Sequence, residues 1–296
     1  MFKTSPVIVC LVLSFAHAGA QPLEKAVHDR QIQQWRAQRL DSLKKPDSWL
    51  TLVGLFWLDP GENRFGTDPA NNMVLPQGSG PPFAGSFFLD ENERVYVRSV
   101  LDAQLTLRGE QLTERRLRAD DEEEPDVLRL GHLSFSVIRR VGRVAIRVKD
   151  PGSPARLNFK GLEYYPVRWD HRVVAEFVPY ESPREVVVPT VLGTPERMLA
   201  AGHAKFSFQG HTLTLEPFVR SEDDKELFFI FKDETSGKDT YPAGRYLYAQ
   251  RRAGRIILDF NKAYNPPCAF TAYATCPYPT KQNWLAVPIE AGEKNY

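Results

Sequence analysis

Polar side chains that could form a binding or catalytic site are concentrated near the C-terminus, at Asp259, Asn261, Tyr264 and Asn265. Side chains alternate in direction along a strand, so a strand at 255–260 would place Asp259 and Asn261 on one face. A carboxylate beside a carboxamide can orient a sugar hydroxyl, bind a cation or act as a general base, and Tyr264 and Asn265 could complete such a cluster. The alternative is that these side chains only hold the loop by bonding to local backbone.

Charged residues near this cluster extend the possible chemistry. If the turn at 253–254 makes a hairpin, Arg245 runs beside Asp259 and either forms a structural ion pair with it or binds an anion. Glu290 or Glu293 could join Asp259 as a second carboxylate for acid-base work.

The histidines and the acidic residues do not follow a metal-binding spacing. His203 and His211 flank an expected hairpin and His171 follows Asp170, but no zinc-ligand spacing joins them to the cysteines. The acidic run at 120–126 lacks the ligand spacing of a calcium loop and is typical of a solvated loop. We therefore predict no metal site.

Familiar catalytic and cofactor signatures are also missing. The sequence has no G-x-S-x-G elbow, H-E-x-x-H helix, phosphate-binding G-x-x-x-x-G-K, dinucleotide glycine pattern or C-x-x-C pair. We predict no cofactor. A non-catalytic binding module for a small molecule or glycan is favoured, and the alternative is a hydrolase or lyase that uses Asp259 with a second carboxylate.

The first 20 residues have the pattern of a secretory signal peptide. Lys3 precedes an apolar run at 6–16, and small residues end in Ala18-Gly19-Ala20. We predict cleavage after Ala20 or after Ala18 and a periplasmic or secreted protein. The apolar run is too short to cross a bilayer and no later run approaches that length, so we expect no membrane insertion of the mature chain.

Loss of the leader removes one lysine and changes the formal charge from +1 to about zero, which argues against a nucleic-acid partner. The mature chain would keep only Cys268 and Cys276. In an oxidising compartment, two cysteines that close a short loop are candidates for a disulfide.

The elements that must position these residues are mostly strands. Residues 23–45 lack Gly and Pro and precede Pro46, which predicts one helix that docks through Ile32, Trp35 and Leu43. Beyond it, short apolar or alternating runs separated by turn residues predict an antiparallel all-β architecture, a sandwich or barrel. The expected strands are 50–58, 86–90, 94–100, 104–108, 132–138, 143–149, 172–178, 184–191, 204–209, 211–217, 226–231, 245–250, 255–260 and 284–289.

Several long motifs resemble the domain of unknown function 1684 (DUF1684) family of bacteria and archaea. They are GRYL at 244–247, DFNKAYNPPCAF at 259–270, the later CP, NWL and AGEK, and SWLTLVGLFWLDPGENRFGTDPANNMVLP at 48–76. The resemblance covers nearly all of the chain after the leader, and it implies no established chemistry.

The first half also resembles a forkhead-associated domain. The resemblance lies in the stretches RFGTDPANNMVLP and AGSFFLDENERVYV. Where forkhead-associated domains have a Ser and a His that help form the phosphopeptide surface, this chain has PPFAG at 81–85. Turn residues at 150–156 separate two sets of strands. We therefore predict a signal peptide at 1–20, a helix at 21–46, a forkhead-associated-like sandwich at 47–152 and a family-defining β domain at 153–296.

Overall fold

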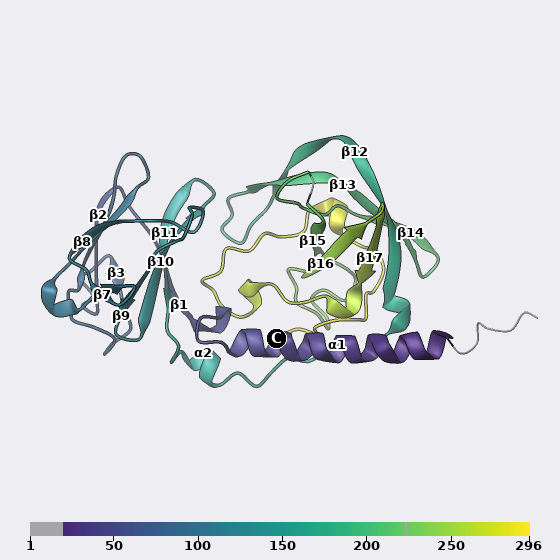
Figure 1. Cartoon of the computed structure of the whole chain (residues 1–296), viewed down its shortest axis with the longest axis horizontal. Coiled ribbons are helices and arrows are strands. Elements are labelled where there is room, and N and C mark those ends of the chain that lie inside the picture. The colour runs from purple at the N-terminus through teal and green to yellow at the C-terminus, as the bar shows by residue number, and fades with distance from the viewer. Residues whose placement is uncertain (1–19, 223) are drawn as a thin grey trace, which may run out of the picture.

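The computed structural model describes residues 20–222 and 224–296. One long helix, α1 (Ala20–Lys44), precedes two bodies built of mostly antiparallel sheets, and it lies along the second body (Figure 1). The predicted all-β class with an N-terminal helix is thus confirmed. The predicted leader lies outside the described residues except for Ala20. None of the described helices is both long and apolar enough to cross a lipid bilayer.

The first body is a sandwich of two sheets with strand orders β1-β11-β10-β9-β6-β7 and β3-β2-β4-β5-β8. Alternate side chains of both sheets point inward, and the rings of Phe65, Phe87 and Phe135 meet in its core with centroids 4.8 to 6.4 Å apart. The strands are β1 (Leu52–Trp57), β2 (Gly61–Gly66), β3 (Met73–Val74), β4 (Gly85–Leu89), β5 (Val95–Ser99), β6 (Thr106–Leu107), β7 (Glu110–Gln111), β8 (Glu114–Leu117), β9 (Val127–Leu130), β10 (Leu133–Arg140) and β11 (Arg143–Lys149).

The acidic run at 120–126 is not simply a solvated loop, as the sequence suggested. Asp120 lies 2.6 Å from the guanidinium of Arg140, and the buried Asp126 lies 3.1 Å from that of Arg118. Arg140 of β10 and Arg118, which directly follows β8, therefore hold the loop against the sandwich.

The second body is one strongly curved sheet with the order β14-β13-β12-β17-β16-β15. The backbone N–H of Phe218 donates to Phe228 O at 2.7 Å, and that of Val219 donates to Leu199 O at 2.9 Å. This segment joins the edge strand β15 to β13, so the sheet closes partly into a barrel. The strands are β12 (Arg172–Val188), β13 (Glu196–Phe208), β14 (His211–Leu215), β15 (Glu226–Phe231), β16 (Arg245–Arg252) and β17 (Arg255–Asp259).

Two strand predictions differ from the structure. The runs at 172–178 and 184–191 belong to one long strand, β12, whose pairing with β13 shifts between Pro179 and Arg184. The segment 284–289 is not a strand, although Leu285, Val287 and Ile289 are buried. Pro288 has no N–H to donate, and the backbone of the segment pairs with residues 232–234 through isolated bonds rather than a ladder, such as Leu285 N–H to Lys232 O at 2.7 Å.

Helix α1 docks on the second body through an apolar seam and several polar contacts. Ile32 and Leu43 are fully buried beneath it. Arg36 donates to the Tyr165 carbonyl at 2.8 Å, and His28 Nε2 lies 2.8 Å from Asp259 Oδ2. The contacts span most of the helix, so its exposed side chains are fixed relative to the sheet.

Candidate functional site

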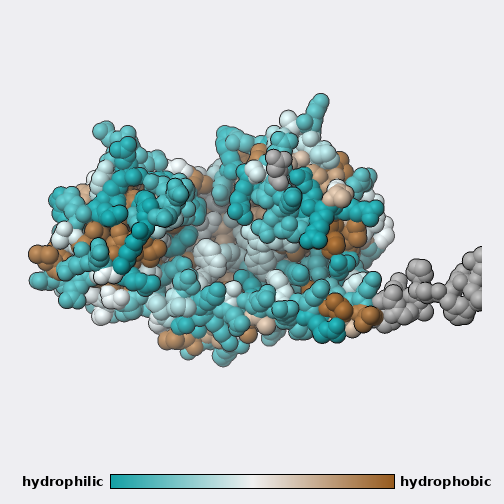
Figure 2. Space-filling model, in the orientation of Figure 1, coloured by the Kyte–Doolittle hydropathy of each residue, from teal (hydrophilic) through white to brown (hydrophobic). Residues whose placement is uncertain are grey.

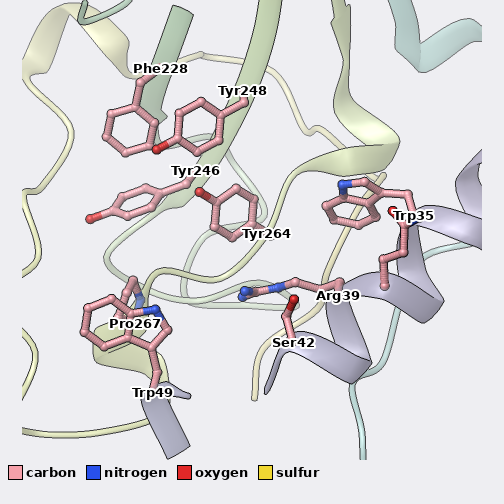
Figure 3. A pocket seen from close by; sticks show the side chains of 10 residues that line it. Trp35, Arg39, Ser42, Trp49, Phe228, Tyr246, Tyr248, Tyr264 and Pro267 are labelled. Atoms are coloured by element: carbon pink, nitrogen blue, oxygen red, sulfur yellow. The ribbon is translucent and has the colours of Figure 1, made fainter. Parts of the chain in front are cut away.

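An aromatic cleft lies between α1 and the second body. It has a volume of about 500 Å³, and rings from five separate segments of the chain face it (Figure 3). We call this site the aromatic cleft; its lining residues are Trp35, Gln38, Arg39, Ser42, Trp49, Phe228, Tyr246, Tyr248, Tyr264 and Pro267. Six aromatic rings around one hollow are typical of a binding site for a small molecule.

Strand alternation puts aromatic rings on the outer face of β15 and β16. Leu227 and Leu247 point into the core with no exposed surface, whereas Phe228 and Tyr248 lie on the opposite face. Phe228 and Tyr248 are cross-strand partners, and their rings stack with centroids 4.8 Å apart at 27°. This pair forms a rigid aromatic wall of which Tyr248 remains 49% exposed.

Tyr264 completes the wall from the loop after β17. Its backbone N–H and carbonyl both bond to Tyr246 of β16, at 2.9 and 2.8 Å, so the loop behaves here like an added strand. The ring of Tyr264 lies nearly parallel to Tyr248 at 14° and edge-on to Tyr246 at 89°. The three tyrosine rings are therefore held in one arrangement by backbone bonds.

Arg39 brings the positive charge of the cleft. Its guanidinium points from α1 toward the tyrosines and lies 4.7 Å from the Tyr264 ring centroid (Figure 3). Nε donates to Glu293 Oε1 at 2.9 Å and Nη2 to the Asn265 carbonyl at 3.1 Å. Nη1 has no hydrogen-bond partner within residues 20–222 and 224–296. The fixed guanidinium can thus donate to an acceptor on a ligand.

The helix and two short turns supply the remaining walls. Gln38 and Arg39 lie three and four residues after Trp35, and Ser42 lies four and three residues after them, which places all four on one face of α1. Trp49 begins the 3-10 turn Trp49–Thr51, and Pro267 begins the turn Pro267–Ala269. The chain thus closes the cleft where α1 leads into the sandwich.

The tyrosine hydroxyls of the cleft are neutral at ordinary pH. Burial raises the pKa of Tyr246, Tyr248 and Tyr264 above the usual value. None of the residues that line the cleft is a carboxylate or a histidine. The cleft therefore offers aromatic faces, neutral hydroxyls and one guanidinium, which suit binding better than acid-base chemistry.

Asp259 and Asn261, two of the predicted site residues, hold the loop. Asp259 Oδ1 accepts from the Asn261 side chain at 2.9 Å and from its backbone N–H at 3.3 Å, while Oδ2 faces His28. The amide of Asn261 also bonds to the backbone N–H and carbonyl of Arg168, both at 2.8 Å. Asn261 is fully buried, and Asp259 lines a groove next to the aromatic cleft.

Asn265 is likewise fully buried beneath the cleft, whereas Tyr264 lines it. The Asn265 N–H donates to Glu293 Oε2 at 2.8 Å, and its side chain donates to the Lys294 carbonyl at 2.7 Å. Of the carboxylates expected near Asp259, Glu293 bonds Asn265 and Arg39, and Glu290 lies 3.3 Å from Arg168. Neither contacts Asp259.

The expected pair of Arg245 with Asp259 is wrong. The hairpin of β16 and β17 forms, but Arg245 points into the core and pairs with Asp233 at 2.8 Å, and both side chains are fully buried. Its guanidinium also donates to the backbone carbonyls of Ile289, at 2.9 Å, and of Ala291. Strand alternation explains this, because Arg245 shares a face with Leu247 rather than with Tyr248.

Cys268 and Cys276 are free thiols, so the structure does not contain the predicted disulfide. They are neighbours nonetheless, since the backbone N–H of Cys268 donates to Cys276 Sγ at 3.0 Å. The Cys268 thiol and burial raise the pKa of Cys276. Within the described residues no group of three or more His, Cys, Asp or Glu side chains could hold a metal ion.

Sequence reasoning missed Arg39, Phe228 and Tyr248 as site residues, and it assigned Trp35 only to the docking of the helix. Trp35 and Arg39 could have been found as a pair because they lie four residues apart on the predicted helix. Phe228 and Tyr248 could have been found because side chains alternate along their two strands. What the sequence lacks is the contact between helix and hairpin, which lie about 190 residues apart along the chain.

Comparison with known proteins places this chain in a family. Residues 157–294 match the family described as "Protein of unknown function (DUF1684)". The motifs at 244–247 and 259–270 lie within this match, whereas the motif at 48–76 lies outside it. The solution NMR structure of an uncharacterized protein of Haloarcula marismortui is 33% identical, with a TM-score of 0.40, and the match covers 47% of this chain and 78% of that one. No curated protein shows significant similarity to the chain.

The structure is also similar to forkhead-associated (FHA) domains. One is the FhaA FHA domain, at 18% identity and a TM-score of 0.25, over 33% of this chain and 96% of that one. Another is an FHA domain of Chlamydia trachomatis, at 16% identity and a TM-score of 0.23, over 32% of this chain and 93% of that one.

Proposed function

The chain belongs to the DUF1684 family, and we propose that it is a non-catalytic binding protein whose aromatic cleft takes a small molecule or glycan. The observation that carries this proposal is the ring of six aromatic side chains around a hollow of about 500 Å³ with one fixed guanidinium. The C–H faces of a sugar or a flat apolar ring pack on the electron-rich faces of Tyr and Trp. Arg39 would donate a hydrogen bond to an oxygen of the ligand.

The alternative, a hydrolase or lyase based on Asp259, has less support from the geometry. Both oxygens of Asp259 are occupied by His28 and Asn261, and the expected second carboxylates bond elsewhere. These bonds take three of about four acceptor sites of the carboxylate, and acid-base catalysis by a carboxylate pair would also need the second carboxylate beside it. Incubation of a bound oligosaccharide with the protein should therefore return it unchanged, as judged by chromatography.

The leader pattern of residues 1–20 supports an exported protein of the cell envelope. We expect protein purified from its native host to begin at Gln21, as measured by mass spectrometry. An intact Met1–Tyr296 chain in the cytosol would contradict export without touching the cleft.

The binding proposal is tested with Tyr248→Ala. Tyr248 is 49% exposed, so its removal should leave the fold intact. We expect thermal-shift screening of small metabolites and oligosaccharides to identify a ligand, and Tyr248→Ala to weaken its Kd by at least about tenfold, roughly 1.4 kcal/mol.

Tyr273→Ala is the matched control, because Tyr273 is also exposed but does not line the cleft. It should bind like the unaltered protein. If a ligand bound Tyr248→Ala as tightly as Tyr273→Ala, the aromatic cleft would not be its binding site.

A further inference from the structure

The aromatic cleft continues into a second groove along α1. This groove has a volume of about 630 Å³, and it shares Trp35 and Tyr248 with the cleft. On its helix side Gln31 adds one further turn to the face that carries Trp35 and Ser42. At 1.5 Å per residue, the stretch from Gln31 to Ser42 spans roughly 16 Å, which is longer than one sugar ring.

The groove is basic. It is lined by Arg172, Arg252, Arg255 and Lys262, and none of these has an ion-pair partner among the described residues. Two carboxylates line it as well, but each is already engaged. Glu226 lies 3.5 Å from Arg220, and Asp259 faces His28 and Asn261.

The floor of the groove is apolar. Val174 of β12 and Ile257 of β17 pair across the sheet and are 59% and 43% exposed. Figure 2 shows brown, hydrophobic residues on the second body in the region where Figure 1 places β16 and β17. An apolar floor with a cationic rim fits a chain that presents flat C–H faces inward and negative groups outward.

We infer that the ligand is an acidic oligosaccharide, an inference that rests on the proposed function. One sugar stacks against Tyr248 and Tyr264 in the aromatic cleft, and the following sugars lie over Val174 and Ile257. Their carboxylates meet the unpaired guanidinium and ammonium groups. A nucleic acid is the less suitable polyanion, because the whole chain carries a formal charge of only +1.

The test compares short uronic-acid oligosaccharides with their methyl esters, which keep the sugar rings and lose the charge. Calorimetry should show tighter binding of the acids, and their affinity alone should fall as salt is added. The exposed pair Arg252→Glu/Arg255→Glu should bind the acids at least about tenfold more weakly and the esters unchanged. Arg94→Glu, an exposed reversal on the sandwich, is the control and should leave both affinities unchanged.

The outcomes separate this inference from the proposed function. Acids and esters bound equally well, or acid binding that survives the double reversal, would overturn the acidic ligand and leave the aromatic cleft standing. Failure of every oligosaccharide, acid or ester, to bind the folded protein would overturn the acidic oligosaccharide and would leave only a small molecule as the ligand of the aromatic cleft. Tighter binding of a single-stranded oligonucleotide than of any uronic-acid chain would replace the glycan by a nucleic acid.

Discussion

At the scale of single residues, the polar side chains that attract attention in the sequence mostly hold the fold. Asn261 and Asn265 are buried and bond to the backbone, which is the loop-holding alternative that the sequence left open. The residue types did not decide which of these side chains serves a site; the direction in which each side chain points did. Tyr264, the aromatic member of the cluster, is the one that lines the cleft.

Asp259→Asn tests the loop-holding role. The carboxamide cannot accept from both His28 and Asn261 as a carboxylate does, so we expect the free energy of unfolding to fall by about 1–3 kcal/mol for the lost buried bonding. Urea unfolding measures it, with the exposed Asp102→Asn as control. Binding of a neutral oligosaccharide to the folded variant should be unchanged.

The opposite result would restore Asp259 as a functional group. Unchanged stability together with lost binding is what a site residue gives, since functional groups are often not optimal for the fold.

At the scale of elements, β16 serves both the fold and the cleft. Its inner face carries Arg245, whose buried pair with Asp233 and bonds to 289–291 fasten the C-terminal segment. Its outer face carries Tyr246 and Tyr248. Glu293 follows this fastened stretch by two residues, and its carboxylate accepts a hydrogen bond from Arg39 in the cleft.

Alternation in the sequence predicts most strands of both bodies because half-buried strands have period two. It fails at 284–289, where Leu285, Val287 and Ile289 alternate but bury themselves against the open end of the sheet rather than within it. Strand and buried loop share a pattern there, and only the position of Pro288 distinguishes them.

The cleft itself was beyond the sequence. The rings of Trp35 and Tyr248 meet only because His28, Arg36 and Arg39 fix α1 across the curved sheet. Those contacts join residues more than a hundred positions apart, and nothing in local propensity or periodicity encodes such distances. The partner of Arg245 was likewise not predictable, because no sequence motif links Arg245 to Asp233.

At the scale of the whole molecule, buried tyrosines couple the fold to alkaline pH. Burial raises the pKa of Tyr165 from the ordinary 10.0 to about 12, and it also raises those of Tyr246 and Tyr264. In each case the neutral phenol is favoured by the folded state. The backbone of Tyr165 contacts α1, and Tyr246 and Tyr264 line the aromatic cleft.

We therefore predict that stability is lost on the alkaline side. Below about pH 10 the phenols are protonated in both states and their full contribution is present. Above it the unfolded chain releases protons that the folded protein retains, so the free energy of unfolding falls as pH rises from about 10 to about 12 and beyond. Urea unfolding at a series of pH values measures the decline, and Tyr264→Phe should reduce it, because that side chain no longer titrates in either state.

Tyrosinate absorbance gives an independent readout: the buried phenols should ionise only when the protein unfolds. If all tyrosines of the folded protein titrated at the ordinary value, the buried, neutral cleft described here would be incorrect.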